Sequence, residues 1–92
     1  MIYFFNMDTI QTLRQQIDEL DKKLVELLGQ RFALVAKIGV EKKKNNLPIV
    51  DEKRQEEKKI ALRELATKNN VDITFVEKVW DVLFKEAHKI EQ

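Results

Sequence analysis

The feature that most limits the fold of this chain is one long apolar heptad repeat in its first half. Large apolar residues recur at the a and d positions of a heptad without a break over about four heptads. These residues are Ile10, Leu13, Ile17, Leu20, Leu24, Leu27, Leu34 and Ile38. A helix from Ile10 to Lys44 would be about 50 Å long. A chain of 92 residues cannot cover such a helix in a compact monomer, so the repeat indicates that two copies pair along it.

The composition agrees with long helices and with pairing. The chain has two glycines and one proline, and 36% of its residues are charged, which favours helices with solvated faces over a sheet with turns. Without cysteine, neither a disulfide nor a thiolate metal site can stabilise so small a core. Oligomerisation is the remaining common route to more buried surface.

Capping and breaking residues divide the chain into three predicted helices. Asp8 followed by Gln11 predicts the start of the first helix as an N-cap with a capping-box partner. Residues 45–48, which include Asn45, Asn46 and Pro48, are predicted to end it. Residues 8–92 are therefore expected to form one domain, with residues 1–7 as an N-terminal extension.

The second and third helices are expected to be shorter. The second is predicted from Asp51, which can cap, to about Lys68, and two asparagines at positions 69 and 70 end it. Asp72 is predicted to cap the third helix. The apolar stripe of that helix comprises Val76, Val79, Trp80, Leu83, Phe84 and Ala87. The predicted fold class is all-α, with three helices per chain, one of them very long, in an intertwined homodimer.

Several classes of function are disfavoured by charge and motif content. A net charge of +1 gives no overall field for nucleic acid or an acidic membrane. The apolar start, residues 1–6, is too short for a signal peptide or a membrane span, so a soluble cytoplasmic protein is expected. One histidine and no cysteine offer no metal site and no catalytic triad, and no glycine-rich phosphate loop is present.

Three cations lie on or beside the apolar seam. Arg31 occupies an a position, where a guanidinium is costly unless it meets an anion or a carboxylate. Arg14 and Lys42 occupy flanking e positions, where the simplest interpretation is a solvated rim with ion pairs between chains. For Arg31, the corresponding simple interpretation is a buried pair with an acidic residue of another helix.

Spacing along the helix gives an alternative for these cations. Arg31 and Lys42 are about three turns apart, so they share a face about 16 Å apart and could converge on a small anion. Arg14 lies about 25 Å before Arg31 and could join the site only from an antiparallel partner chain. Three cations around one pocket would suit a small dicarboxylate.

Glu91 continues the apolar stripe of the third helix. Near a chain end, such a carboxyl is commonly frayed and solvated. The alternative is a buried carboxylic acid that stays neutral and donates a hydrogen bond. His88 lies one step off the stripe and is expected to be solvated.

These residues carry a resemblance to a known family. The segments LRQQIDELDKKLVELLGQR (residues 13–31), Lys37-Ile38-Gly39 with Lys42, and LPIVDEKRQ (residues 47–55) together resemble the all-helical class of chorismate mutases. In that family, three helices from each of two chains interlock and each dimer holds two active sites. The resemblance implies an isomerase, without cofactor or metal, that rearranges chorismate to prephenate in aromatic amino acid biosynthesis.

The resemblance also implies roles for individual residues. Arg31 and Lys42 come from one chain and Arg14 from the other. Asp51 and Arg54 shape the site near the ring hydroxyl of the substrate. Lys42 lies at the ether oxygen, and a second donor from the last helix, at the position of Glu91, completes that contact.

Three positions depart from the family pattern. Gln55 replaces a glutamate that accepts from the ring hydroxyl, and Ala87 replaces a small hydroxyl residue that contacts a carboxylate. Glu91 replaces a glutamine that donates to the ether oxygen, although some members carry glutamate there. These departures leave other functions open. On the same fold, the alternatives are an isochorismate-pyruvate lyase and a mutase of the 4-amino analogue. From another class, the alternative is a non-catalytic helical dimerisation or regulatory module.

Overall fold

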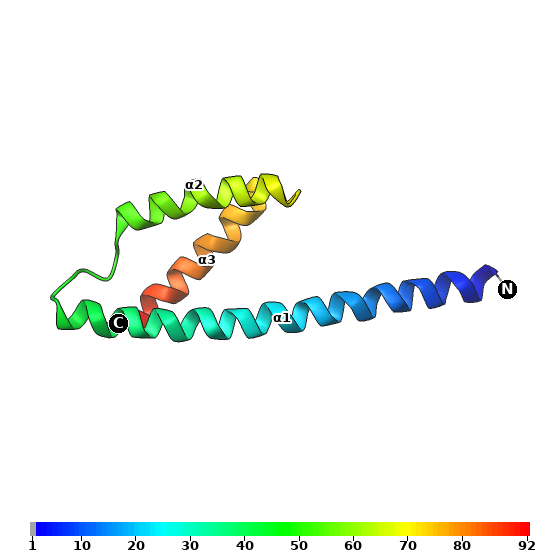
Figure 1. Cartoon of the computed structure of the whole chain (residues 1–92), viewed down its shortest axis with the longest axis horizontal. Coiled ribbons are helices and arrows are strands. Elements are labelled where there is room, and N and C mark those ends of the chain that lie inside the picture. The colour runs from blue at the N-terminus through cyan, green and yellow to red at the C-terminus, as the bar shows by residue number, and fades with distance from the viewer. Residues whose placement is uncertain (1) are drawn as a thin grey trace. The chain divides into compact units, whose positions relative to one another are not determined.

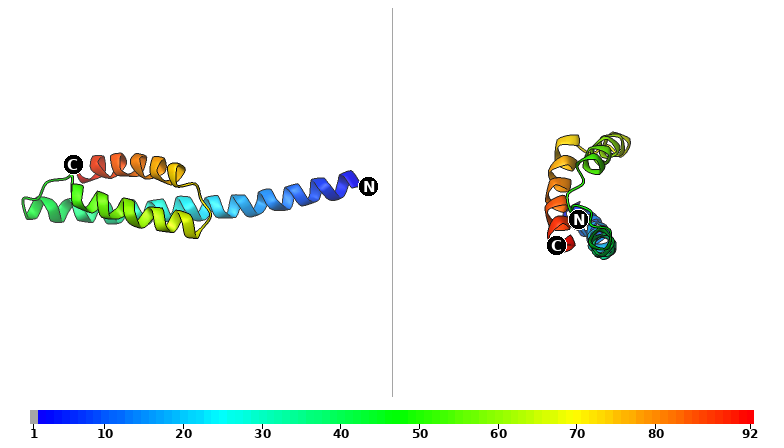
Figure 2. Two further views of the ribbon diagram at one scale, coloured as in Figure 1. Left: turned by 90° about the horizontal axis from the view of Figure 1, so that it is seen from above. Right: turned by 90° about the vertical axis from the view of Figure 1, so that its left-hand side faces the viewer.

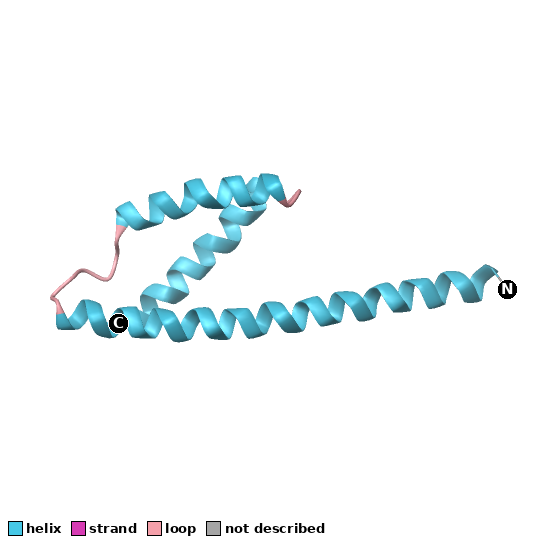
Figure 3. Ribbon diagram, viewed as in Figure 1, coloured by secondary structure: helices cyan, strands magenta, loops and turns pink. Residues whose placement is uncertain are grey.

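Three helices make up the described part of the chain in the computed structural model (Figures 1 and 3). Helix α1 spans Ile2–Lys44, α2 spans Glu52–Lys68 and α3 spans Ile73–Glu91. The structure describes residues 2–92, and the side chains of residues 8–92. Within residues 2–92 there is no strand, so the all-α class and the three helices predicted from the sequence are confirmed.

The predicted start of the first helix is wrong. Helix α1 begins at Ile2, so Asp8 lies inside the helix and does not cap it with Gln11 as partner. The physical reason is that residues 2–7 contain no proline or glycine, so nothing interrupts the helix once it has formed. The division into an extension, residues 1–7, and a domain, residues 8–92, stays a prediction.

The asparagine pairs end two helices in the same way, as the sequence predicted. Asn46 and Asn70 adopt left-handed backbone conformations, with φ of 54° and 55°. The next amide in each case bonds back five residues, from Leu47 to the carbonyl of Lys42 at 2.8 Å and from Val71 to that of Ala66 at 2.9 Å. This is the Schellman arrangement, and asparagine is a residue that tolerates its left-handed position.

Aspartates begin the other two helices. Asp51 precedes α2 and its Oδ1 accepts from the amide of Arg54 at 3.0 Å. Asp72 precedes α3 and its Oδ2 accepts from the amide of Phe75 at 3.0 Å. Each carboxylate satisfies an amide that the first helical turn leaves without a partner, which confirms both predicted caps.

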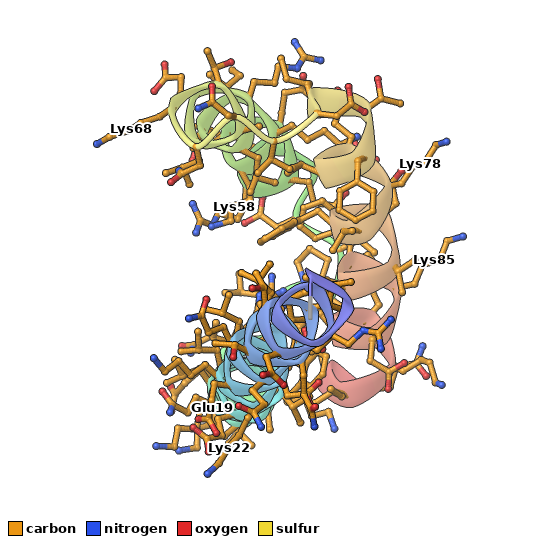
Figure 4. All side chains as sticks on the ribbon, turned by 90° about the vertical axis from the view of Figure 1, so that its right-hand side faces the viewer. Glu19, Lys22, Lys58, Lys68, Lys78 and Lys85 are labelled. Carbon is orange, nitrogen blue, oxygen red and sulfur yellow. The ribbon has the colours of Figure 1, made fainter. Side chains whose placement is uncertain are left out.

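The chain divides into two compact units, Met1–Ala33 and Leu34–Gln92. The second unit contains the end of α1, the connecting loop, and the helices α2 and α3, which pack antiparallel against each other (Figure 2). Leu62 and Ala66 of α2 and Ala87 of α3 are its buried apolar residues. Lys78 and Lys85 point from α3 into solvent, on the side away from α2 (Figure 4).

The described residues of the unit Met1–Ala33 form helix alone. The apolar heptad residues of this unit are exposed in the single chain, for example Ile17 at 54%, Leu20 at 59% and Leu27 at 59%. Charged residues such as Glu19 and Lys22 project from the same helix (Figure 4). A lone helix cannot bury its own apolar stripe, so this unit has an uncovered surface of the kind that a coiled-coil partner covers.

Candidate active site

A buried ion pair joins the end of α1 to the end of α3. Lys42 Nζ lies 2.6 Å from Glu91 Oε1, and the two side chains are only 17% and 6% exposed. Glu91 is the buried charged residue of the described side chains. The interpretation of Glu91 as a frayed, solvated residue is therefore wrong, because the last turn of α3 is docked on α1 within the unit Leu34–Gln92.

Gly39 makes this close approach of the two helices possible. A Cβ atom placed on Gly39 would lie 2.8 Å from the Cα and 3.1 Å from the carbonyl oxygen of Glu91. Real Cβ atoms do not come so close to backbone, so any other residue would force the helices apart. Gly39 is three residues, about one turn, before Lys42, which places the docked carboxylate beside the lysine.

The connecting loop supplies a second acceptor to the same ammonium group. Lys42 Nζ donates to the carbonyl oxygen of Ile49 at 2.5 Å. Ile49 is followed two residues later by Asp51, the cap of α2, so this bond ties the start of α2 to Lys42. Asp51 and Arg54 are both exposed at that helix start, with the Asp51 carboxylate engaged by the Arg54 amide.

A second polar contact links α2 to α3. The amide nitrogen Nε2 of Gln55 lies 2.9 Å from Nε2 of His88, and both side chains are partly buried. The prediction that His88 is solvated is wrong, because the packing of α2 on α3 covers the ring even though it lies one step off the apolar stripe. Ala87, beside it in the chain, is 8% exposed.

These contacts converge on the last turn of α3. His88 and Glu91 are three residues apart and so lie on one face of the helix, where His88 meets α2 and Glu91 meets α1. The structure thus brings together four of the predicted site residues in one small region: Lys42, Glu91, Gln55 and Ala87. Asp51 lies close by through the loop bond of Lys42.

Of the three arginines of the predicted site, Arg14 and Arg31 belong to the unit Met1–Ala33, and Arg54 belongs to the unit Leu34–Gln92. Arg14 is exposed, whereas Arg31 is partly buried and its Nη1 has no hydrogen-bond partner among the described residues. A buried guanidinium nitrogen without an acceptor is costly, which is the situation expected of a group that binds an anion from elsewhere. The joint action of Arg14, Arg31 and Lys42 on one substrate stays a prediction.

An open apolar groove of about 520 Å³ follows the end of α1 and the start of the loop. It is lined by Leu34, Lys37, Ile38, Glu41, Lys42, Asn45 and Leu47. Two of these residues, Leu34 and Ile38, are the last members of the heptad repeat, and Lys42 stands at the edge of the groove. Among the described residues, no group of acidic, histidine or cysteine side chains is arranged to hold a metal, and no helix there is long and apolar enough to cross a membrane.

Sequence reasoning missed three members of this site. Gly39 entered only as part of a motif, although a glycine inside a long helix is itself a signal of close packing. The backbone carbonyl of Ile49 has no sequence signal at all. His88 was set aside because its helical phase differs by one step from the apolar stripe, yet the contact with Gln55 lies at the edge of that stripe.

Comparison with known proteins agrees with this geometry. Residues 13–92 match the family described as chorismate mutase type II. The chain is 33% identical over 76 residues to a bifunctional chorismate mutase/prephenate dehydratase of Buchnera aphidicola, covering 83% of this chain and 20% of that protein. It is 31% identical over 85 residues to a T-protein of Haemophilus influenzae, covering 92% of this chain and 22% of that protein.

A third relative is of similar size. The chain is 24% identical over 86 residues to a chorismate mutase of Methanocaldococcus jannaschii, covering 94% of this chain and 87% of that protein. Against the first two relatives, the chain spans about a fifth of their length. Because the family match covers nearly all of the helical fold, including Lys42, Gln55 and Glu91, this chain belongs to the chorismate mutase type II family.

Proposed function

We propose that this protein rearranges chorismate to prephenate. The observation that carries the proposal is the buried contact of Lys42 with Glu91, at 2.6 Å, within a family match that covers both residues. Lys42 and the position of Glu91 are the pair that the family resemblance assigns to the ether oxygen of the substrate. A cation and a carboxyl group are thus held together away from water, and the cation, Lys42, also lines the apolar groove.

The proposed reaction needs no nucleophile and no net proton transfer. It is intramolecular: the ether C–O bond breaks while a new C–C bond forms, and the atoms of the product are those of the substrate. The ether oxygen gains negative charge in the transition state. Catalysis then requires a compact substrate conformer and donors placed at that oxygen. Lys42 supplies a fixed cation, and arginines bind the two substrate carboxylates with directional donors.

The role of Glu91 depends on its proton. As a carboxylate it pairs with Lys42 and would repel the developing charge, whereas as an acid it donates to the same oxygen. Glu91 Oε1 and Lys42 Nζ are 2.6 Å apart, so both groups can face one substrate atom. We propose that substrate binding exchanges the Lys42–Glu91 ion pair for two hydrogen-bond donors aimed at the ether oxygen.

An antiparallel homodimer, with the two chains intertwined, is the second part of the proposal. The exposed apolar repeat of α1 and the Arg31 nitrogen without a partner among the described residues both call for a second chain. Because Arg14 and Arg31 are about 25 Å apart along one helix, Arg14 would act in the active site of the partner chain. A cytoplasmic location remains part of this proposal.

Product analysis tests the function directly. The purified protein is incubated separately with chorismate, isochorismate and the 4-amino analogue of chorismate, and the products are identified by mass spectrometry. We expect prephenate from chorismate. Release of pyruvate from isochorismate alone would establish the lyase instead, turnover of the amino analogue alone would establish the amino mutase, and no turnover of any would establish a non-catalytic module.

A further inference from the structure

Gln55 poses a chemical question that the family resemblance leaves open. A glutamate at this position accepts a hydrogen bond with either carboxylate oxygen, whichever way its terminal group is turned. A glutamine has one accepting end, Oε1, and one donating end, Nε2. The amide therefore keeps the accepting role only if something fixes its oxygen toward the ligand.

The contact between Gln55 and His88 supplies that constraint. Gln55 Nε2 points at His88 Nε2, 2.9 Å away, from the neighbouring helix. An amide nitrogen can only donate, so the ring nitrogen must accept, and the proton of the neutral imidazole then lies on Nδ1. This leaves Gln55 Oε1 on the opposite side of the amide, without a bond to His88 and available to accept.

The Gln55–His88 pair lies at the same end of α3 as the Lys42–Glu91 pair. His88 is one helical turn from Glu91, which contacts Lys42, and Gln55 lies in the first turn of α2, whose entry loop provides the Ile49 carbonyl that accepts from Lys42. The two contacts made by this end of α3 therefore connect Gln55 and Lys42 to the same turn of the helix.

We infer that His88 is a positioning residue, which orients the Gln55 amide so that Oε1 accepts a hydrogen bond from the ring hydroxyl of the substrate. The inference rests on the proposed function for the identity of the ligand, and on the Gln55–His88 contact for the orientation. In this chain the acceptor is then the neutral amide oxygen of Gln55, held in place by His88, where the family pattern has a carboxylate. Such an acceptor favours a substrate whose ring substituent is a hydrogen-bond donor.

The orientation can be measured without any activity. Because the chain contains a single histidine, the ¹⁵N resonances of its imidazole are assigned without ambiguity. In the neutral imidazole we expect the proton on Nδ1 and none on Nε2. Gln55→Leu removes the donor and should shift the tautomer balance toward Nε2–H. A proton on Nε2 in the unaltered protein would overturn the inference.

A double-mutant cycle tests whether the orientation of the Gln55 amide by His88 affects catalysis. The variants are His88→Leu, Gln55→Glu and the two together, assayed for kcat/KM with chorismate, and Lys85→Gln on the outward side of α3 serves as control (Figure 4). With Gln55 present, His88→Leu frees the amide to turn and should lower kcat/KM by about twofold to tenfold, the value of one hydrogen bond. In the Gln55→Glu background, the same change at His88 should cost less than about twofold, since both carboxylate oxygens accept.

Each outcome of the cycle decides something different. Equal losses in both backgrounds mean that His88 only packs the helices, and no loss in either means that it has no role, so both overturn the inference. If the unaltered protein turns over no substrate, the proposed function has failed, and the tautomer measurement then decides the Gln55–His88 orientation by itself.

Discussion

In the unit Leu34–Gln92, the buried carboxylate of Glu91 forms an ion pair with the ammonium group of Lys42. The partly buried side chain of Gln55 forms a hydrogen bond with His88. In the unit Met1–Ala33, Arg31 has a buried nitrogen with no acceptor among the described residues, and the apolar residues of the heptad repeat are exposed. The first of these units makes both polar contacts within the chain, although its buried Trp80 Nε1 has no partner among the described residues. The second leaves its apolar repeat exposed, so the two units differ in how much of their own apolar surface the single chain buries.

A charge introduced into the heptad seam should have the largest effect. Leu24 is an a residue and Val25 its neighbour outside the repeat, and both are exposed in the single chain, at 58% and 68%. If a second chain covers the seam, Leu24→Glu buries a charge and deletes apolar contacts in both copies, which should weaken dimerisation on the order of a thousandfold. Val25→Glu should leave it nearly unchanged.

Sedimentation across a dilution series, followed by circular dichroism at each concentration, measures this difference. The unaltered protein and Val25→Glu should sediment as dimers and lose helix only on dissociation. A folded, helical monomer of the unaltered protein at micromolar concentration, or equal behaviour of the two variants, would show that the unit Met1–Ala33 needs no partner.

Removal of Lys42 should be the next largest effect, and it probes the other unit. Lys42→Ala removes the cation aimed at developing charge and should lower kcat by a factor of at least about a hundred, which corresponds to about 3 kcal/mol or more. The dimer should persist, because the heptad seam is intact. Lys44→Ala is a suitable control, since Lys44 is 67% exposed and pairs with Glu41 on the surface of the same helix. Near-full activity of Lys42→Ala would exclude Lys42 from the mechanism.

Mixing two inactive variants tests whether one active site contains Arg31 of one chain and Arg14 of the other chain. Arg14→Ala and Arg31→Ala should each be nearly inactive as homodimers, because each site lacks one arginine. Random exchange of chains makes about half of the dimers mixed, with one of their two sites complete, so about a quarter of the normal activity should return. No recovery, once mixed dimers are confirmed by mass spectrometry, would place both arginines of a site in the same chain.

Replacement of Glu91 tests the hydrogen-bond donor proposed at this position. Glu91→Gln supplies an amide donor in place of the carboxyl group, and it should raise activity several-fold at neutral pH. Glu86→Gln, which alters an exposed i,i+3 pair with Lys89, is the matched control.

The rates of the three proteins are compared at neutral pH and matched substrate saturation. Activity of Glu91→Gln equal to or below that of the unaltered protein would exclude a donor role for position 91. In that case its contact with Lys42 is structural.

Replacing each of the two glycines of α1 by alanine should have the smallest effects, and these effects are on stability. A Cβ atom at Gly29 would have nothing within 4 Å, whereas at Gly39 that atom would meet the backbone of Glu91. Gly29→Ala should stabilise the protein by about 0.5–1 kcal/mol through helix propensity. Gly39→Ala should destabilise it by about 1–3 kcal/mol because α3 must move. Urea unfolding measures both, and equal shifts would contradict the close docking of α3.

The helix boundaries were largely predictable from local sequence. Asp51 and Asp72 cap helices because a short acidic side chain reaches the free amides of the first turn, and Asn46 and Asn70 end helices because asparagine tolerates a positive φ. Asp8 was misassigned for an equally local reason. A capping residue starts a helix only where the preceding residues do not already continue it, and residues 2–7 do.

The chemistry-bearing residues were predictable in kind but not in arrangement. By itself, the sequence determined that the chain is helical, that its first helix carries a long apolar heptad repeat, and that Lys42, Gln55 and Glu91 belong to a recognisable family pattern. Only the tertiary structure decided that Glu91 is buried against Lys42 and that His88 contacts Gln55. Periodicity gives the face of a helix on which a residue lies, but the partner of that face depends on how closely two helices approach. Here the absence of a Cβ atom on Gly39 sets the distance between α1 and α3. The contact joins Gly39 to Glu91, which are far apart in the sequence of the unit Leu34–Gln92.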